Sequence, residues 1–224
     1  MTFVYQPPMR VLAAVLLIGT RSVATAQEST RPVFLETFDG GWHDRWSTQS
    51  LGRRPTSFTV IEEGGNPVLR VVADRSASAL IRRVRVPVTP AVALRWRWRV
   101  ALPLEGNEPE RERAGDDYAA RVFVLFGSPT LDRNTRALLY VWAAHEAAGA
   151  TYRSPYMEQV MTIVLQTGAG AGWMGEERNL LADYRRAFGE DPPPVSAVAV
   201  MTDADDTGAR AVAVFDDIAI VRRR

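Results

Sequence analysis

The sequence contains no cysteine, no lysine and only two histidines, and each shortage removes a class of chemistry. Without cysteine the chain has no disulfide, no thiolate metal site, no lipid-anchored cysteine and no cysteine nucleophile. Without lysine it cannot form a Schiff base. With His43 and His145 alone, a multi-histidine metal centre is not expected. The chain also lacks a G-x-S-x-G elbow and a phosphate-binding loop, so the common enzyme templates fail.

The first 26 residues have the pattern of a secretory signal peptide. Val11–Ile18 forms an apolar core after Arg10, and Ala24–Ala26 matches the small-x-small cleavage pattern. The apolar run is too short for a transmembrane helix, which needs about 20 such residues. We therefore expect a signal peptide over 1–26, one mature domain over 27–224 and a periplasmic or secreted location, with no membrane span after cleavage.

Charge is nearly balanced, with 27 basic and 26 acidic side chains. Such a chain has no basic excess to hold a phosphate backbone, so a nucleic-acid partner is not expected. Nothing in the composition assigns an oligomeric state.

Short segments of alternating or continuous apolar residues, separated by turn residues, predict β-strands along most of the chain. The predicted strands are Val33–Phe38, Phe58–Glu62, Val68–Ala73, Ala79–Val86, Ala93–Ala101, Asp117–Phe126, Ala137–Ala143, Gln159–Gln166, Val195–Thr202 and Ala211–Val221. The charged segment Glu105–Asp117 and the glycine-rich segment Gly168–Gly175 are expected to be loops.

One helix is expected near 179–188, because Leu180, Leu181, Tyr184 and Phe188 recur at helical spacing. Gly189 follows at the position of a C-terminal cap. The fold class is therefore all-β: a single antiparallel β-sandwich or jelly roll of about ten strands with one short helix. Two small sandwiches are the alternative.

The strand that contains Trp96 and Trp98 has two contrasting faces. Alternation places both tryptophans on one face, which suits a hydrophobic core, and Arg95, Arg97 and Arg99 on the other. A row of planar guanidinium groups is well shaped for carboxylates, phosphates or sugar hydroxyls. This face is the first candidate binding surface.

Asp117 and Arg121 share a face of a strand that is apolar on both sides, so we expect this strand to be central. If it neighbours the arginine strand, Asp117, Arg121 and Arg97 would form one charged network. That network would be either the floor of a ligand site or a structural set of ion pairs.

Two tryptophans are candidates for stacking on a sugar ring. Trp173 lies in the glycine-rich loop, and Trp142 follows Tyr140 on one strand face. The flat surface that stacks on a sugar also packs in a core, so ordinary packing is the alternative for both.

Two sets of carboxylates are candidates for a structural Ca²⁺ site. Asp203–Gly208 begins like a calcium loop but has Val214 at the twelfth position, so an acidic hairpin turn is expected there. Glu36 and Asp216 lie on apolar strand faces. If the first and last strands pair, these two would share an ion with Asp39 or Asp217 nearby. A bulge that turns Asp216 outward is the alternative.

Several blocks resemble, in order, a family of secreted bacterial proteins catalogued as domain of unknown function 3047. These blocks are Trp96–Val100, Asp116–Val124, Tyr140–Trp142, Trp173 with Glu177–Asn179, Asp183–Glu190 and Met201–Gly208. The resemblance extends roughly from Leu35 to Ile220, departs at Ala182, Ala204, Asp206 and Val214-Phe215, and implies no activity. More loosely, Phe34–Trp42 and Phe215–Ile218 are similar to the edges of carbohydrate-binding jelly rolls, which often hold a calcium near their termini.

These patterns predict a non-catalytic protein that binds a carbohydrate or a similar polar ligand and requires no cofactor. The expected ligand-binding residues are Arg97, Asp117, Arg121 and Trp173, supported by Arg95, Arg99 and Trp142. One alternative is a polysaccharide-acting enzyme with a carboxylate pair, although no spacing singles a pair out. Another is a structural partner in a cell-envelope complex, whose acidic surface the arginines would meet.

Overall fold

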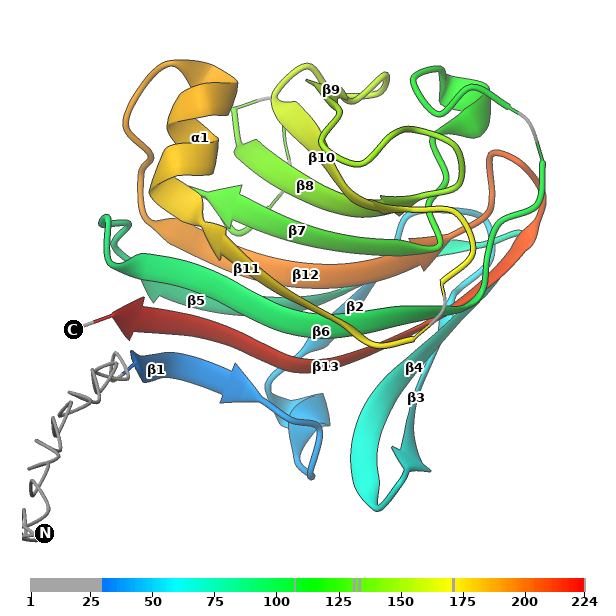
Figure 1. Cartoon of the computed structure of the whole chain (residues 1–224), viewed down its shortest axis with the longest axis horizontal. Coiled ribbons are helices and arrows are strands. Elements are labelled where there is room, and N and C mark those ends of the chain that lie inside the picture. The colour runs from blue at the N-terminus through cyan, green and yellow to red at the C-terminus, as the bar shows by residue number, and fades with distance from the viewer. Residues whose placement is uncertain (1–29, 107, 131, 133, 171, 224) are drawn as a thin grey trace, which may run out of the picture.

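The computed structural model describes residues 30–106, 108–130, 132, 134–170 and 172–223, which fold into two β-sheets packed face to face (Figure 1). The predicted signal peptide lies outside these residues and stays a prediction. The predicted β-sandwich with one helix is confirmed.

One sheet has six strands. They are β1 (Thr30–Glu36), β3 (Ser57–Glu63), β4 (Asn66–Asp74), β6 (Val92–Leu102), β11 (Met174–Asn179) and β13 (Arg210–Arg223). The order is β11-β6-β13-β4-β3, and β1 also pairs with β13. The first half of β13 pairs with β4 and its second half pairs with β1, so this long strand connects the sheet.

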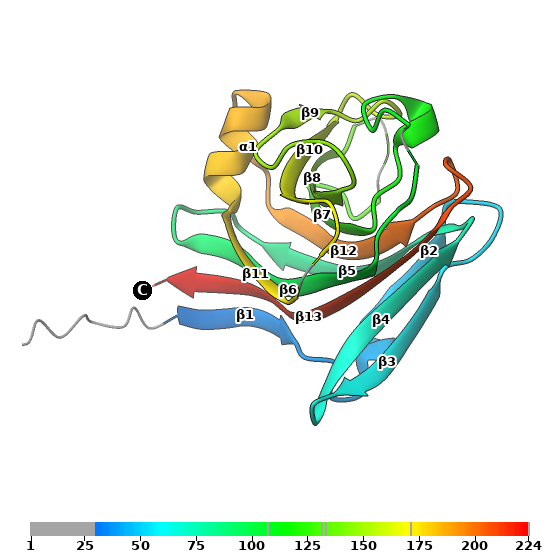
Figure 2. The ribbon, with the colours of Figure 1, turned by 45° about the vertical axis from the view of Figure 1, so that its right-hand side comes forward.

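The other sheet has seven strands. They are β2 (Ser47–Ser50), β5 (Ala77–Val86), β7 (Ala120–Phe126), β8 (Arg136–Ala143), β9 (Thr151–Arg153), β10 (Val160–Thr167) and β12 (Val195–Asp203). The order is β2-β5-β12-β7-β8-β10-β9. All neighbours are antiparallel except β8 and β10, which run parallel. Figure 2 shows this sheet lying across the six-stranded one.

The space between the sheets is filled by apolar side chains, many of them aromatic. Trp96 and Trp98 point inward from β6, as the alternation predicts, and their rings lie 5.4 Å apart at nearly a right angle. Trp98 also lies 5.8 Å from Trp142 of β8, and Trp96 lies 5.4 Å from Tyr140. Edge-to-face contacts of this kind add to the stability that burial provides.

The seven-stranded sheet is buried on its outer face as well. Phe123 and Leu139 lie there in a second apolar cluster, against which Tyr152 and Met157 of the β8–β10 connection pack. Every residue of β7 is therefore buried, which confirms the prediction of a central strand covered twice. The strand begins at Ala120, three residues later than predicted.

The helix α1 (Leu180–Phe188) confirms the helix predicted near 179–188 and begins one residue later, at Leu180. The Asn179 side chain accepts a hydrogen bond from the Ala182 N–H at its start, and Gly189 ends it with a φ of 76°. Within the described residues, neither this helix nor the two short 3-10 helices, Trp42–Asp44 and Arg113–Gly115, could cross a membrane.

The segment Glu105–Asp117 departs from the expected exposed loop, because Glu110, Asp116 and Asp117 are buried. The Glu110 carboxylate accepts hydrogen bonds from three successive backbone N–H groups, those of residues 144–146, at 2.7–3.1 Å. Buried carboxylates persist when such donors surround them. The loop is thus fixed against the β8–β10 connection.

Candidate functional site

The arginines of β6 lie on the outer face of the six-stranded sheet, and each is paired with a carboxylate. Arg95 Nε donates to Glu177 at 2.6 Å, and Arg99 donates to Glu63. Arg97 donates from Nε to Asp217 and from Nη2 to Asp216, both at 2.6 Å. The expected row of cations is therefore a row of ion pairs.

Neighbouring strands bring these carboxylates into position. Glu177 of β11 lies opposite Arg95, and Asp216 of β13 lies opposite Arg97, as cross-strand pairs. The pairing shifts after Asp216, where Asp217 has a φ of 51°. This bulge places two successive carboxylates on the outer face, so the expected inward position of Asp216 is wrong and the bulge alternative holds.

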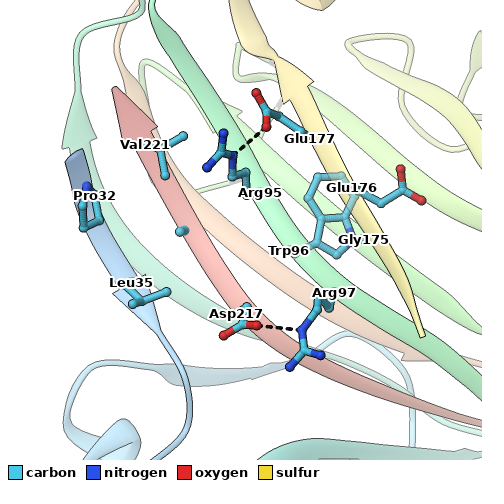
Figure 3. Close-up of a pocket in the computed structure, with 11 residues that line it drawn as sticks. Pro32, Leu35, Arg95, Trp96, Arg97, Gly175, Glu176, Glu177, Asp217 and Val221 are labelled. Atoms are coloured by element: carbon cyan, nitrogen blue, oxygen red, sulfur yellow. Dashed lines mark hydrogen bonds and ion pairs between the residues drawn. The ribbon is translucent and has the colours of Figure 1, made fainter. Parts of the chain in front are cut away.

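A groove of about 500 Å³ runs along this face between β1, β13, β6 and β11 (Figure 3). Its apolar part consists of Pro32, Leu35, Gly175, Ala219 and Val221. The pairs Arg95–Glu177 and Arg97–Asp217 stand beside this apolar part, as Figure 3 shows. The groove therefore combines an apolar surface with fixed donors and acceptors.

Trp173 lies just before β11, next to the arginines. Its ring centroid is 5.1 Å from the guanidinium carbon of Arg97 and 5.7 Å from that of Arg99, which are cation–π distances. The side chain is half-buried. The structure thus brings Arg97, Arg99 and Trp173 together, as the ligand-site hypothesis requires.

Trp142 does not belong to this group. Its side chain is 4% exposed, packs on Trp98 in the core and donates from Nε1 to the Gly168 carbonyl at 2.9 Å. No ring face remains for a ligand, so the supporting role expected for Trp142 is wrong and the packing alternative holds.

Asp117 and Arg121 lie on the opposite side of the sandwich, at the outer face of the seven-stranded sheet. The expected network with Arg97 is wrong, because β6 and β7 belong to different sheets. Arg121 is buried over the Tyr118 ring and pairs with Asp203 at 2.7 Å, while Asp117 accepts two hydrogen bonds from Thr207. The expected contact between Asp117 and Arg121 is replaced by these partners.

Burial raises the pKa of several carboxylates around Arg121. Loss of hydration raises the pKa of Asp116 to about 6, and the positive charge of Arg121 only partly opposes this. Asp203, also buried, has a pKa well above its usual value for the same reason. Asp117, Asp203 and Asp205 lie together in one carboxylate cluster. The sequence indicated the calcium-like segment that contains Asp203 and Asp205, but no pattern near Asp117 indicated that this residue would join them.

The first and last strands pair, which meets the condition for the calcium hypothesis, but the four carboxylates expected to bind calcium there do not converge. Glu36 accepts hydrogen bonds from Arg45, Arg82 and Trp46 at 2.8–3.0 Å, whereas Asp39 accepts from Thr37. Burial raises the pKa of Glu36, yet the Arg45 and Trp46 hydrogen bonds outweigh it and keep this pKa below the usual value.

The other two residues of that set, Asp216 and Asp217, share Arg97. No three of the four form a cluster compact enough for one ion in the part of the chain that the structure describes.

A family model described as "Protein of unknown function (DUF3047)" matches residues 44–219. No curated protein matches the chain.

Among solved structures, similar folds include the family 11 carbohydrate-binding module of a cellulosomal cellulase of Clostridium thermocellum. It is 9% identical, with a TM-score of 0.49 over 87% of this chain and 95% of that one. The cellulose-induced protein Cip1 is 14% identical, with a TM-score of 0.49 over 84% and 96%. The xyloglucanase domain of NopAA from Sinorhizobium fredii is 11% identical, with a TM-score of 0.48 over 86% and 100%. With scores below 0.5, these similarities say nothing about what this chain binds.

Proposed function

Because the chain belongs to the DUF3047 family, whose description assigns no activity, we propose its function from its own geometry: it binds a glycan, without catalysis, in the groove on the outer face of the six-stranded sheet. The observation that carries the proposal is the apolar surface of Leu35, Ala219 and Val221 beside the two fixed ion pairs.

This combination matches the chemistry of a sugar. A sugar ring has C–H faces that pack on an apolar surface, and hydroxyls that both donate and accept hydrogen bonds. Arg97 uses Nε and Nη2 for Asp217 and Asp216, and its Nη1 has no hydrogen bond to any described residue. Since a guanidinium carries five N–H donors, Arg97 can bind a hydroxyl while it stays in its ion pairs.

The pairing also favours a neutral ligand. Arg97 faces two carboxylates, and Glu177 pairs with both Arg95 and Arg223, so the ion pairs of the described residues leave no cationic excess here. A strongly anionic ligand would have to compete with these carboxylates, whereas hydroxyls can bind both members of each pair. We therefore expect neutral glycans to bind more tightly than acidic ones.

Trp173 supports the proposal from beside the groove, because it contacts Arg97, which lines the groove. A half-buried indole in contact with two guanidinium groups is costly to move, which makes it a preformed stacking surface. Its loop position lets it contact a ligand that lies along β6.

Binding to an array of neutral and acidic glycans, followed by calorimetry on the best hit, tests the proposal. Arg97→Ala and Trp173→Ala should each weaken binding about tenfold or more, the loss of one anchor in a small interface. Arg186→Ala, which removes an exposed arginine of α1, is the matched control and should bind normally. A folded protein that binds no glycan, or an unchanged affinity in both groove variants, would overturn the proposal. Mass spectrometry of the incubated glycan should show no cleavage product.

A protein partner on the same face is the second candidate, and the exposure of two apolar residues of β1 favours it. Val33 is 46% exposed and Leu35 is 50% exposed. Crosslinking in intact cells should then place crosslinks on β1, whereas a glycan-binding protein should show none there.

The proposal includes a periplasmic or secreted location, supported by the signal-peptide pattern over 1–26. Cell fractionation followed by N-terminal sequencing should recover a chain that begins at Gln27 outside the cytoplasm. A cytoplasmic protein that retains Met1 would contradict it.

A further inference from the structure

Three carboxylates from distant parts of the chain meet at the outer face of the seven-stranded sheet. Asp117 precedes β7, Asp203 ends β12, and Asp205 lies in the turn that follows. One oxygen from each lies within 4.8 Å of the other two. We propose that Asp117, Asp203 and Asp205 form a Ca²⁺ site.

The state of Asp117 is a second observation that points to a cation. This side chain is 1% exposed, and its Oδ2 accepts hydrogen bonds from the N–H and the hydroxyl of Thr207, both at 2.7 Å. Its other oxygen, Oδ1, is buried without a hydrogen-bond partner among the described residues. A buried carboxylate oxygen with no donor is unfavourable, and a bound cation would satisfy it.

The charges around the cluster are unbalanced. Asp116, Asp117 and Asp203 are all buried, and Arg121 is the one cation that forms ion pairs with them in the described part of the chain. Arg121 holds Asp203 at 2.7 Å and lies 3.7 Å from Asp116, so its single charge balances one of these two carboxylates. Asp117, Asp205 and one further carboxylate remain in excess. A divalent ion would neutralise two of these three charges.

Ca²⁺ is proposed because of its coordination chemistry. It takes about 6–8 oxygen ligands at about 2.3–2.6 Å in a flexible geometry, whereas Mg²⁺ requires a near-ideal octahedron at about 2.0–2.1 Å. Carboxylate oxygens that lie within 4.8 Å of one another can contact one Ca²⁺ with little movement.

The site would add to contacts that already hold these segments together. Asp203 and Tyr118 are hydrogen-bonded just before β7, and Thr207 of the turn after β12 bonds Asp117, so the ion would tie this turn more firmly to the start of β7. The remaining acidic neighbour, Asp206, accepts a hydrogen bond from the Tyr156 hydroxyl at 2.6 Å and does not belong to the cluster. The groove of the proposed glycan site lies on the other sheet, so the two proposals can fail independently.

Calorimetry with CaCl₂ on chelator-treated protein, together with thermal unfolding in Ca²⁺ and in EGTA, tests the site. We expect one saturable Ca²⁺ site, a higher unfolding midpoint in Ca²⁺ and weaker binding of Mg²⁺. Asp205→Asn changes an exposed residue, so the fold should survive, and Ca²⁺ affinity should fall about tenfold or more.

Asp206→Asn is the matched control, because it removes one negative charge from the adjacent residue without removing a ligand. Its Ca²⁺ affinity should be close to that of the unmodified protein. A folded protein with no saturable Ca²⁺ binding, or an equal loss in both variants, would overturn the proposal.

Discussion

Arg97 covers Asp216 on the outer face of the six-stranded sheet: the guanidinium donates to the carboxylate at 2.6 Å, and Asp216 is only 1% exposed beneath it. Burial raises the pKa of Asp216 above its usual value, although hydrogen bonds from Arg97 and Asn66 oppose this. The side chain that we propose to contact a ligand therefore also shields a carboxylate from water.

Arg97→Ala should lower the free energy of unfolding by about 1–3 kcal/mol, because Asp216 loses a charged donor and the water that reaches it in the variant replaces that hydrogen bond only in part. Adding Asp216→Asn should recover part of this loss, since the amide needs no cation. Urea unfolding of both single variants and the double variant forms the cycle that measures the coupling. Strictly additive effects would show that the two side chains do not interact.

Asp116 should make the protein less stable as pH rises from about 4 to about 6. Its folded pKa of about 6 exceeds the ordinary value of 3.8, so the folded state binds the extra proton in this range. The contribution of this proton to the free energy of unfolding is fully present below pH 4 and is lost as the pH rises above 6. It amounts to about 3 kcal/mol at most.

Asp116→Asn should remove this pH dependence. From pH 4 to pH 7 the unmodified protein should lose the contribution of the Asp116 proton, whereas the variant has none to lose. The unfolding free energy of the variant minus that of the unmodified protein should therefore increase over this range. Urea unfolding at both pH values, with EGTA present to keep the carboxylates free of metal, measures the difference. A constant difference between the two proteins would contradict the assignment.

Gly170 touches the core tryptophan beneath its loop, and a side chain there should be unfavourable. A β-carbon at Gly170 would lie 2.9 Å from Cζ2 of Trp142 and 3.1 Å from the Val100 carbonyl oxygen. Gly170→Ala should therefore lower the unfolding free energy by about 1–3 kcal/mol. Gly172→Ala, where no atom lies within 4 Å of the new carbon, is the control and should change it by less than about 0.5 kcal/mol. Equal unfolding midpoints for the two variants would show that the Trp142 contact is not tight.

Glu36→Gln should lower the unfolding free energy by about 2–3 kcal/mol, because the Arg45 and Arg82 guanidinium groups both lose their charged acceptor. Asp39→Asn, nearby in the same segment, removes an exposed carboxylate and should have little effect. The loss in Glu36→Gln should be the same in Ca²⁺ and in EGTA. If it appeared only in Ca²⁺, the originally predicted calcium site near the first and last strands would regain support.

The sequence predicted the regular elements well where burial leaves a periodic pattern. Each predicted strand, such as Ala93–Ala101, corresponds to an observed strand, and the helix bounds agree to within one residue. The strands β2, β9 and β11 were not predicted, because edge strands that are short, polar or exposed carry no such alternation.

The candidate site was predicted only in part. Alternation of apolar and polar residues along a strand shows which side chains share a face, but it does not show which other strands lie beside that strand. The alternation placed Arg97 on an outer face, yet it did not show that Arg121 belongs to the other sheet. The calcium-like loop at Asp203 was visible, whereas Asp117 reaches it only through tertiary folding. Strand pairing between segments far apart in the sequence determines which side chains meet in such a site, and the residue pattern within one segment does not specify that pairing.

The position of β13 has a consequence for how the chain reaches this fold. It is the last strand along the sequence, yet β1, β4 and β6 all pair with it, so without it the six-stranded sheet would separate into β11–β6, β4–β3 and an isolated β1. Closure of that sheet must therefore wait until residues 210–223 have been synthesised. Until then, the edges of β1, β4 and β6 that later pair with β13 have no partner strand, and a growing chain that exposes such edges is open to pairing with other chains.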